Sequence, residues 1–118
     1  MAIPNALLRR LYVGASLHNV EDGFEFKLRN MVAPATVVAM GPVEVDGVPY
    51  GPNQVTLSAG RPRPASAITH KQPFLLQMGR EVLVKVRGAR LERGAHQVAL
   101  HALTREIGPL VIDIDDSV

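Results

Sequence analysis

The chain has 118 residues and a mass of 12.8 kDa, which is the size of a single domain. It contains no cysteine, so disulfides, thiolate metal sites and cysteine nucleophiles are excluded. Its 47% hydrophobic and 20% charged residues indicate a folded globular domain, and nine prolines with ten glycines argue against a helix bundle.

The net charge of +2 is unevenly distributed along the chain. Residues 1–59 have a net charge of −1, residues 60–105 of +7 and residues 106–118 of −4. The basic middle is typical of a surface for nucleic acid or an anionic ligand. Alternatively, an acidic tail with Asp113, Asp115 and Asp116 folds over it and neutralises it. Because aromatic residues make up only 4% of the chain, we predict no nucleic-acid partner.

Neither a membrane span nor a signal peptide is expected. No uncharged stretch exceeds 14 residues, and the stretch 30–43 is interrupted by Pro34, Gly41 and Pro42, whereas a spanning helix needs about 20 apolar residues. In the first residues the arginines follow a short apolar patch, which is the reverse of a signal peptide. We therefore predict a cytoplasmic protein without a membrane partner.

The first predicted elements are a helical turn and a hairpin. Residues 5–11 form the only helical candidate, with Asn5 as a possible cap and three leucines on one face. An apolar run over 11–20, the turn 21–23 and the strand 24–29 predict the hairpin. In that strand Phe24, Phe26 and Leu28 alternate with charged residues, so one face is buried and the other solvated.

The remaining strands follow at short intervals. Residues 43–45 and 48–50 flank Asp46 and Gly47, a pair that suits a type I′ hairpin turn, and Pro49 places the second arm at a sheet edge. Further strands are predicted over residues 54–57, 81–87, 97–104 and 110–114.

Together these elements predict an all-β fold. We expect one domain over residues 1–118, an antiparallel β-sandwich of the jelly-roll or immunoglobulin-like kind, with eight or nine short strands and at most one N-terminal helical turn. A Pro-rich basic loop at 59–73 and an acidic tail at 113–118 complete the prediction. Alternation does not fix the strand order, so a closed barrel remains an alternative.

One strand is apolar on both faces. In residues 97–104, Val98, Leu100 and Ala102 share one face, and Ala99 and Leu103 flank His101 on the other. Such a strand is either covered by another element or part of a subunit interface. We predict an interface at Ala99, His101 and Leu103, in a homo-oligomer or a hetero-oligomer. The alternative is a small domain that exposes some apolar side chains.

The sequence contains few groups suited to chemistry. Nucleotide-binding glycine motifs, a nucleophile elbow and a paired-histidine zinc motif are absent. His96 and His101 are five residues apart, so on one strand they face opposite sides and cannot share a metal ion. We predict no catalytic residue, no metal ligand and no cofactor in this chain.

The segment 59–73 is the most distinctive loop. Its prolines favour an extended chain, and its basic residues are the candidate contacts for an anion or a partner's cleft. These candidates are Arg61, Arg63, His70 and Lys71. The alternative is a flexible connection without a binding role.

Three segments resemble a known family. The run 16–30, the strand 43–45 with the turn at Asp46 and Gly47, and the approach through Leu91, Gly94, His96 and Val98 to a late strand are similar to the β-subunit of C-glycoside deglycosidases. The resemblance implies a non-catalytic accessory subunit of a carbon–carbon lyase. Its partner would be a (β/α)₈ sugar-isomerase-like subunit that holds a divalent metal.

Two other functions are alternatives to the role of an accessory subunit. The alternative to the accessory subunit is a self-associating β-sandwich that binds a small anionic or sugar ligand by itself. Assignment as a hydroxymethylglutaryl-CoA reductase is without support in the residues, because hydride transfer needs a nicotinamide site and a thioester site and no phosphate-binding glycine loop is present. Activity of the chain alone is left undecided, with a non-catalytic role favoured.

Overall fold

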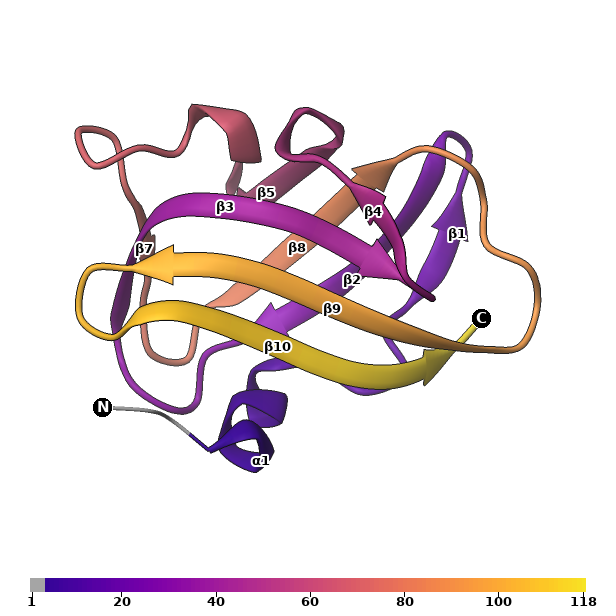
Figure 1. Ribbon diagram of the computed structural model, residues 1–118, viewed down its shortest axis with the longest axis horizontal. Coiled ribbons are helices and arrows are strands. Elements are labelled where there is room, and N and C mark those ends of the chain that lie inside the picture. Colours follow the sequence, from indigo (N-terminus) through magenta and orange to yellow (C-terminus); the bar gives the residue numbers. More distant parts are fainter. Residues whose placement is uncertain (1–3) are drawn as a thin grey trace.

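The computed structural model describes residues 4–118, which form two antiparallel sheets packed face to face (Figure 1). We call them sheet 1, with strand order β1-β2-β8-β5-β6, and sheet 2, with strand order β10-β9-β3-β4 and β7 paired to β3. The strands are β1 His18–Val20, β2 Gly23–Arg29, β3 Ala35–Val45, β4 Val48–Tyr50, β5 Val55–Ala59, β6 Arg61–Pro64, β7 Phe74–Leu76, β8 Glu81–Arg87, β9 Ala95–Thr104 and β10 Gly108–Ser117.

The predicted antiparallel sandwich is confirmed, although residues 4–118 contain ten strands and not eight or nine. Three strand segments were not predicted from the sequence: the first half of β3, β6 and β7. The start of β3 was missed because residues 35–40 are apolar except for Thr36 and do not alternate. The β6 strand was missed because its sequence is Arg-Pro-Arg-Pro. Proline is compatible with a strand at an edge, which is where β6 lies.

The core lies between the sheets and is built by alternation. Phe24, Phe26 and Leu28 of β2 are buried, and their partners across the ladder are the three inward valines of β8. Sheet 2 contributes Val98, Leu100, Ile112 and Ile114 from β9 and β10. Burying a side chain of this size stabilises the fold by roughly 1.5–3 kcal/mol, so the inward rows fix the register of both sheets.

The predicted hairpin turn between β3 and β4 is confirmed. Asp46 and Gly47 both have positive φ, +52° and +81°, as a type I′ turn requires. Asp46 also ties the turn to β9, because its backbone N–H donates to the Gln97 carbonyl over 2.8 Å and its Oδ1 accepts the Gln97 N–H over 2.9 Å. As predicted from Pro49, β4 lies at the edge of sheet 2.

The N-terminal segment covers one open side of the sandwich. It consists of the helical turn α1 Asn5–Leu8 and the 3₁₀ turn η1 Arg9–Leu11, which contact β10 and β2 (Figure 1). Asn5 does not cap the helix as predicted, because Pro4 occupies the cap position and no side chain bonds there. The segment is instead held by its buried leucines, Leu8 and Leu11.

Hydrogen bonds attach the N-terminal segment and the residues that follow it to β10. The Arg9 Nε donates to the Asp113 carbonyl over 3.0 Å, and the Tyr12 hydroxyl donates to Asp116 Oδ2 over 2.6 Å. The same carboxylate oxygen accepts the Leu17 N–H over 3.1 Å. Burial raises the pKa of Tyr12 far above its ordinary value, and the bond to Asp116 raises it further, so the hydroxyl remains a proton donor.

Two segments predicted to be irregular are ordered. The Pro-rich region 59–73 contains β6 and a 3₁₀ turn, η3 Ala65–Ala67, followed by a turn in which Thr69 and Gln72 exchange backbone hydrogen bonds. The acidic residues 113–117 are part of β10 and not a tail over the basic region. Within residues 4–118, no ion pair joins Asp113, Asp115 or Asp116 to a basic side chain, so the alternative of a tail that neutralises the basic region gains no support from ion pairs.

Candidate functional site

The outer face of sheet 2 carries the predicted interface residues. Cross-strand neighbours on this face form three rows: Ala39, Leu103 and Pro109; His101 and Val111; and Glu44, Ala99 and Asp113. The first two rows form what we call the apolar half of this face, together with the bulged Gly41 and Pro42. Val111 is 41% exposed. Asp113 and Asp115 give the other half an acidic character.

His101 stands at the boundary between the two halves. Its Nε2 forms a 2.7 Å hydrogen bond with Glu44 Oε1, and both side chains are half-buried. Gly41 lies against it, since a Cβ at that position would stand 2.8 Å from the His101 Cβ. The bulge that brings Gly41 to this place interrupts the register between Met40 and Val43. Glu44 and Gly41 were not predicted here, because a bulge leaves no signal in the alternation.

His96, near the start of β9, forms hydrogen bonds with two other segments of the chain. Its Nδ1 lies 2.6 Å from Asp46 Oδ2 and its Nε2 lies 2.6 Å from the Glu92 carbonyl. Because both neighbours are acceptors, this arrangement favours the imidazolium, in which both ring nitrogens donate. The Glu92 carbonyl, and then the Asp46 carboxylate, raise the pKa of His96. The bond from the Gln97 N–H, and then His96, lower the pKa of Asp46.

His18 has a similar pair of neighbours. Its Nδ1 lies 2.8 Å from the Ser16 carbonyl and its Nε2 lies 2.7 Å from Glu25 Oε1. Both ring nitrogens of His18 are therefore engaged by groups of the chain itself. Within residues 4–118, no group of three or more side chains that could hold a metal is found. These histidines act as cross-links of the fold.

The four basic candidates of region 59–73 are not brought together by hydrogen bonds into one site. Arg63 is used by the fold: its guanidinium donates to the carbonyls of Pro73 over 2.8 Å and Gln72 over 2.9 Å, and lies over the Phe74 ring at 6.0 Å. Arg61, His70 and Lys71 are exposed. His70 contributes its backbone carbonyl, which accepts a hydrogen bond from Arg105.

Sheet 1 has a charged outer face. Lys27 and Arg29 of β2 pair with Glu81 of β8, at 3.6 and 3.0 Å, and Lys85 pairs with Asp22 at 3.4 Å. These side chains are 40–55% exposed, so the pairs are hydrated. The predicted solvated face of β2 is therefore confirmed, and this surface lacks the apolar character of sheet 2.

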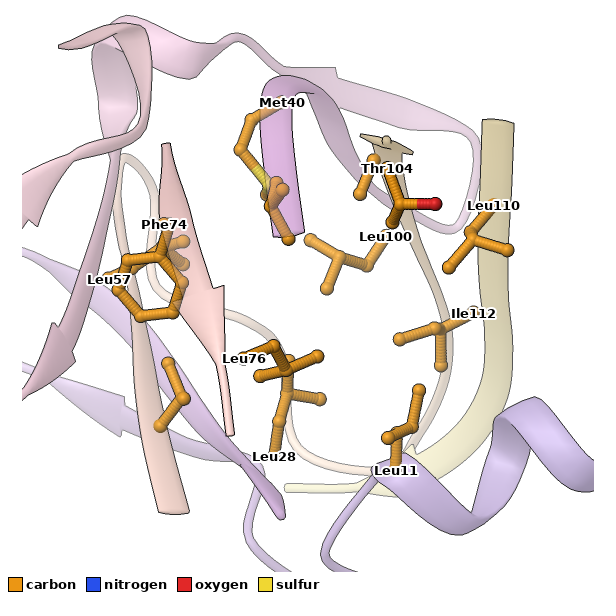
Figure 2. A pocket seen from close by; sticks show the side chains of 13 residues that line it. Leu11, Leu28, Met40, Leu57, Phe74, Leu76, Leu100, Thr104, Leu110 and Ile112 are labelled. Carbon is orange, nitrogen blue, oxygen red and sulfur yellow. The ribbon is translucent and has the colours of Figure 1, made fainter. Parts of the chain in front are cut away.

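A hollow that is partly open lies between the sheets and is lined almost wholly by carbon (Figure 2). Its volume is about 40 Å³. Pockets that bind cofactors or drug-sized molecules measure roughly 300–1,000 Å³, so this cavity cannot take a nicotinamide or a coenzyme A group. In the same part of the chain, residues 4–118, no helix is long and apolar enough to cross a membrane.

Comparison with known proteins corrects the predicted family. A family model described as hydroxymethylglutaryl-CoA reductase, N-terminal domain, matches residues 7–118, whereas no curated protein matches the sequence. The resemblance to the C-glycoside deglycosidase β-subunit, and the functions predicted with it, are therefore wrong. The rejection of an assignment to hydroxymethylglutaryl-CoA reductase is wrong as well. It rested only on the absence of catalytic and cofactor-binding motifs. The chain belongs to the family of hydroxymethylglutaryl-CoA reductase N-terminal domains.

Proposed function

We propose that this chain is an association domain of a hydroxymethylglutaryl-CoA reductase system, and that it pairs with a second copy through the apolar half of the outer face of sheet 2. The observation that carries the proposal is the contrast between this face, with Leu103, Pro109 and Val111 turned outward, and the ion-paired face of sheet 1. A reductase site is not part of the proposal, and no cofactor is assigned to this chain.

The sheet edges support association through a face. An exposed edge strand pairs readily with another chain unless proline or charge blocks it. Pro62 and Pro64 lie in β6, and Pro49 lies in β4. The edge strand β10 carries Pro109 and three aspartates, and the N-terminal cover packs against it. With β4, β6 and β10 protected in this way, the apolar half is the surface that gains most from leaving water.

The shape and charge of this face suit a second copy. Ala39, Gly41 and Ala99 project little, so two such sheets can stack at about the 10 Å spacing of a β-sandwich. A two-fold axis through the apolar half places the acidic halves, with Asp113 and Asp115, at opposite ends of the interface. Because the apolar half covers only three strands, we expect a weak dimer at the small end of interface sizes.

Sedimentation velocity over a concentration series tests this proposal. The unmodified chain should shift from monomer to dimer, and Leu103→Asp or Val111→Asp should keep it monomeric. Leu83→Asp is the matched control, because Leu83 is also a half-buried outward side chain at the centre of a strand, but in sheet 1. A thermal melt verifies that each variant is folded. A monomer up to about 1 mM, where association contributes only about 4 kcal/mol, would refute the dimer.

An activity measurement tests the non-catalytic part separately. The purified chain, mixed with hydroxymethylglutaryl-CoA and a reduced nicotinamide dinucleotide, should not oxidise the dinucleotide. Turnover that follows the chain through successive purification steps would contradict the proposal. The cytoplasmic location and the absence of nucleic-acid and membrane partners remain predictions of the sequence. The barrel partner and its divalent metal rested on the deglycosidase resemblance and have lost that support.

A further inference from the structure

A hydrogen-bonded pair of ionisable side chains lies on the face that forms the proposed dimer. His101 of β9 and Glu44 of β3 project from the outer side of sheet 2, with 2.7 Å between Nε2 and Oε1. Each side chain is 35% exposed, so both still contact water in the monomer. A second copy that covers this face removes the water, and the cost of that step depends on the charge of the pair.

The charged neighbours of the pair are mostly acidic. Asp113 of β10 lies in the same cross-strand row as Glu44, and Asp115 is the next outward residue of that strand. Arg9 of the N-terminal cover reaches β10 through its Nε, which donates to the Asp113 carbonyl, and its side chain is exposed at the edge of the sheet. On the outward positions of β9 and β10 in the described chain, His101 is therefore the one side chain that can become positively charged.

Protonation of His101 changes what a dimer has to bury. When the imidazole is neutral, its Nε2–H donates to a carboxylate whose charge is not compensated, and two copies bring two such carboxylates into one interface. When the imidazole is protonated, each copy buries a pair without net charge. Because a two-fold axis makes the two pairs equivalent, both copies respond to the same change of pH.

We propose that the dimer is pH-dependent and that protonation of His101 favours it. This inference rests on the proposed dimer and adds its regulation. Because the dimer takes up protons that the separate monomers bind less tightly, it strengthens as the pH falls through the range in which histidines titrate and weakens as the pH rises through it. With one His101 in each copy, we expect the Kd to increase by at least roughly tenfold from about pH 6 to about pH 8.

Sedimentation velocity over a concentration series, repeated between about pH 6 and about pH 8 at constant salt, tests the switch. In His101→Gln the side-chain amide can still donate to Glu44 but cannot gain a proton, so its Kd should be independent of pH and close to that of the unmodified chain at the alkaline end. A Kd of the unmodified chain that is constant, or that decreases as the pH rises, would refute the switch and leave the dimer intact. A monomer at every pH would refute both.

Two further variants locate the effect. His18→Gln is the matched control, because His18 also lies 2.7 Å from a glutamate, Glu25, but on sheet 1, so this variant should keep the full pH dependence. Glu44→Gln removes the carboxylate and should dimerise more tightly than the unmodified chain at alkaline pH, with the pH dependence lost or reversed. Loss of the dependence in His18→Gln, or its persistence in Glu44→Gln, would overturn the assignment. Thermal melts at each pH verify that the variants are folded.

Discussion

The two outward faces of the sandwich are built by the same rule but have opposite surfaces. In β2 and β8 each buried residue alternates with an outward one that is mostly charged, and the outward charges pair across the strands. In β9 and β10 the inward residues are equally apolar, but Leu103, Pro109 and Val111 face outward. The two sheets therefore resemble each other in their buried inward residues and differ in the residues that face outward.

The charge of the two faces supports the proposal that association uses sheet 2 and not sheet 1. Lys27, Arg29 and Glu81 keep their hydration and have partners within their own sheet, so covering them would require their desolvation. The apolar half of sheet 2 has no such cost except at the Glu44–His101 pair. The histidines differ in the same way. His96 joins two chain segments, whereas His101 lies at the centre of an exposed surface.

The largest expected effect on stability is a difference between Leu100, which faces inward from β9, and Leu103, which faces outward. Leu100 is buried and lines the cavity, so Leu100→Ala should lower the free energy of unfolding by about 3 kcal/mol. Leu103→Ala removes the same atoms from the outer face and should cost at most about 1 kcal/mol in the monomer. Urea denaturation of both variants at low concentration measures the difference. Equal costs would mean that the outer face is as well packed as the core.

The second prediction concerns the bulge that holds His101. Gly41→Ala places a methyl group against the His101 Cβ and should cost roughly 1–3 kcal/mol, because β9 or the histidine must move. Gly51→Ala is the control, since no atom lies within 4 Å of a Cβ there and φ is −69°. It should be neutral or slightly stabilising. Thermal melts of the two proteins give the comparison, and similar losses of stability would rule out the close contact at Gly41.

The third prediction is a pH dependence at His96. Because its pKa is raised in the folded chain, its stabilisation is complete below the ordinary histidine pKa and is lost as the pH rises through the raised value. The lowered pKa of Asp46 has the reverse effect: its stabilisation is complete above the ordinary aspartate pKa and is lost as the pH falls through the lowered value.

The stability difference between the unmodified chain and His96→Gln should therefore be greatest between the ordinary aspartate and histidine pKa values and should shrink in alkali. Thermal melts of both proteins over a pH series measure it. A difference that is constant from acid to alkali would show that the ring does not act as an imidazolium.

The smallest effect is expected on the charged face. Glu81→Gln removes the carboxylate that Lys27 and Arg29 share, but exposed ion pairs contribute little, so we expect a loss of at most about 0.5 kcal/mol. Raising the salt concentration should abolish even this difference. Urea denaturation at low and high salt measures it. A larger loss that persists at high salt would contradict the assignment of this face as a hydrated surface.

Much of the fold could be predicted from residue patterns. The strands β2 and β8 and the turn at Asp46 and Gly47 are predictable from local patterns, namely the alternation of apolar and charged residues and residue types that tolerate positive φ. The first half of β3 and the Arg-Pro-Arg-Pro strand were missed, because apolar runs and prolines are ambiguous without their neighbours. The family was misidentified because short strand motifs are shared by many sandwiches, whereas the family model matched residues 7–118.

In strands with clear alternation, such as β2 and β8, the sequence by itself determined which side chains face inward, since a period of two then admits only one buried set. It also marked Ala99, His101 and Leu103 as an outward row, but not what surrounds them. Only the tertiary structure decided that Gly41 and Glu44 contact His101, that Arg63 supports its own loop and that a cavity remains between the sheets. Those contacts join residues far apart in the chain, and strand order, bulges and packing volume, which no local pattern encodes, bring them together.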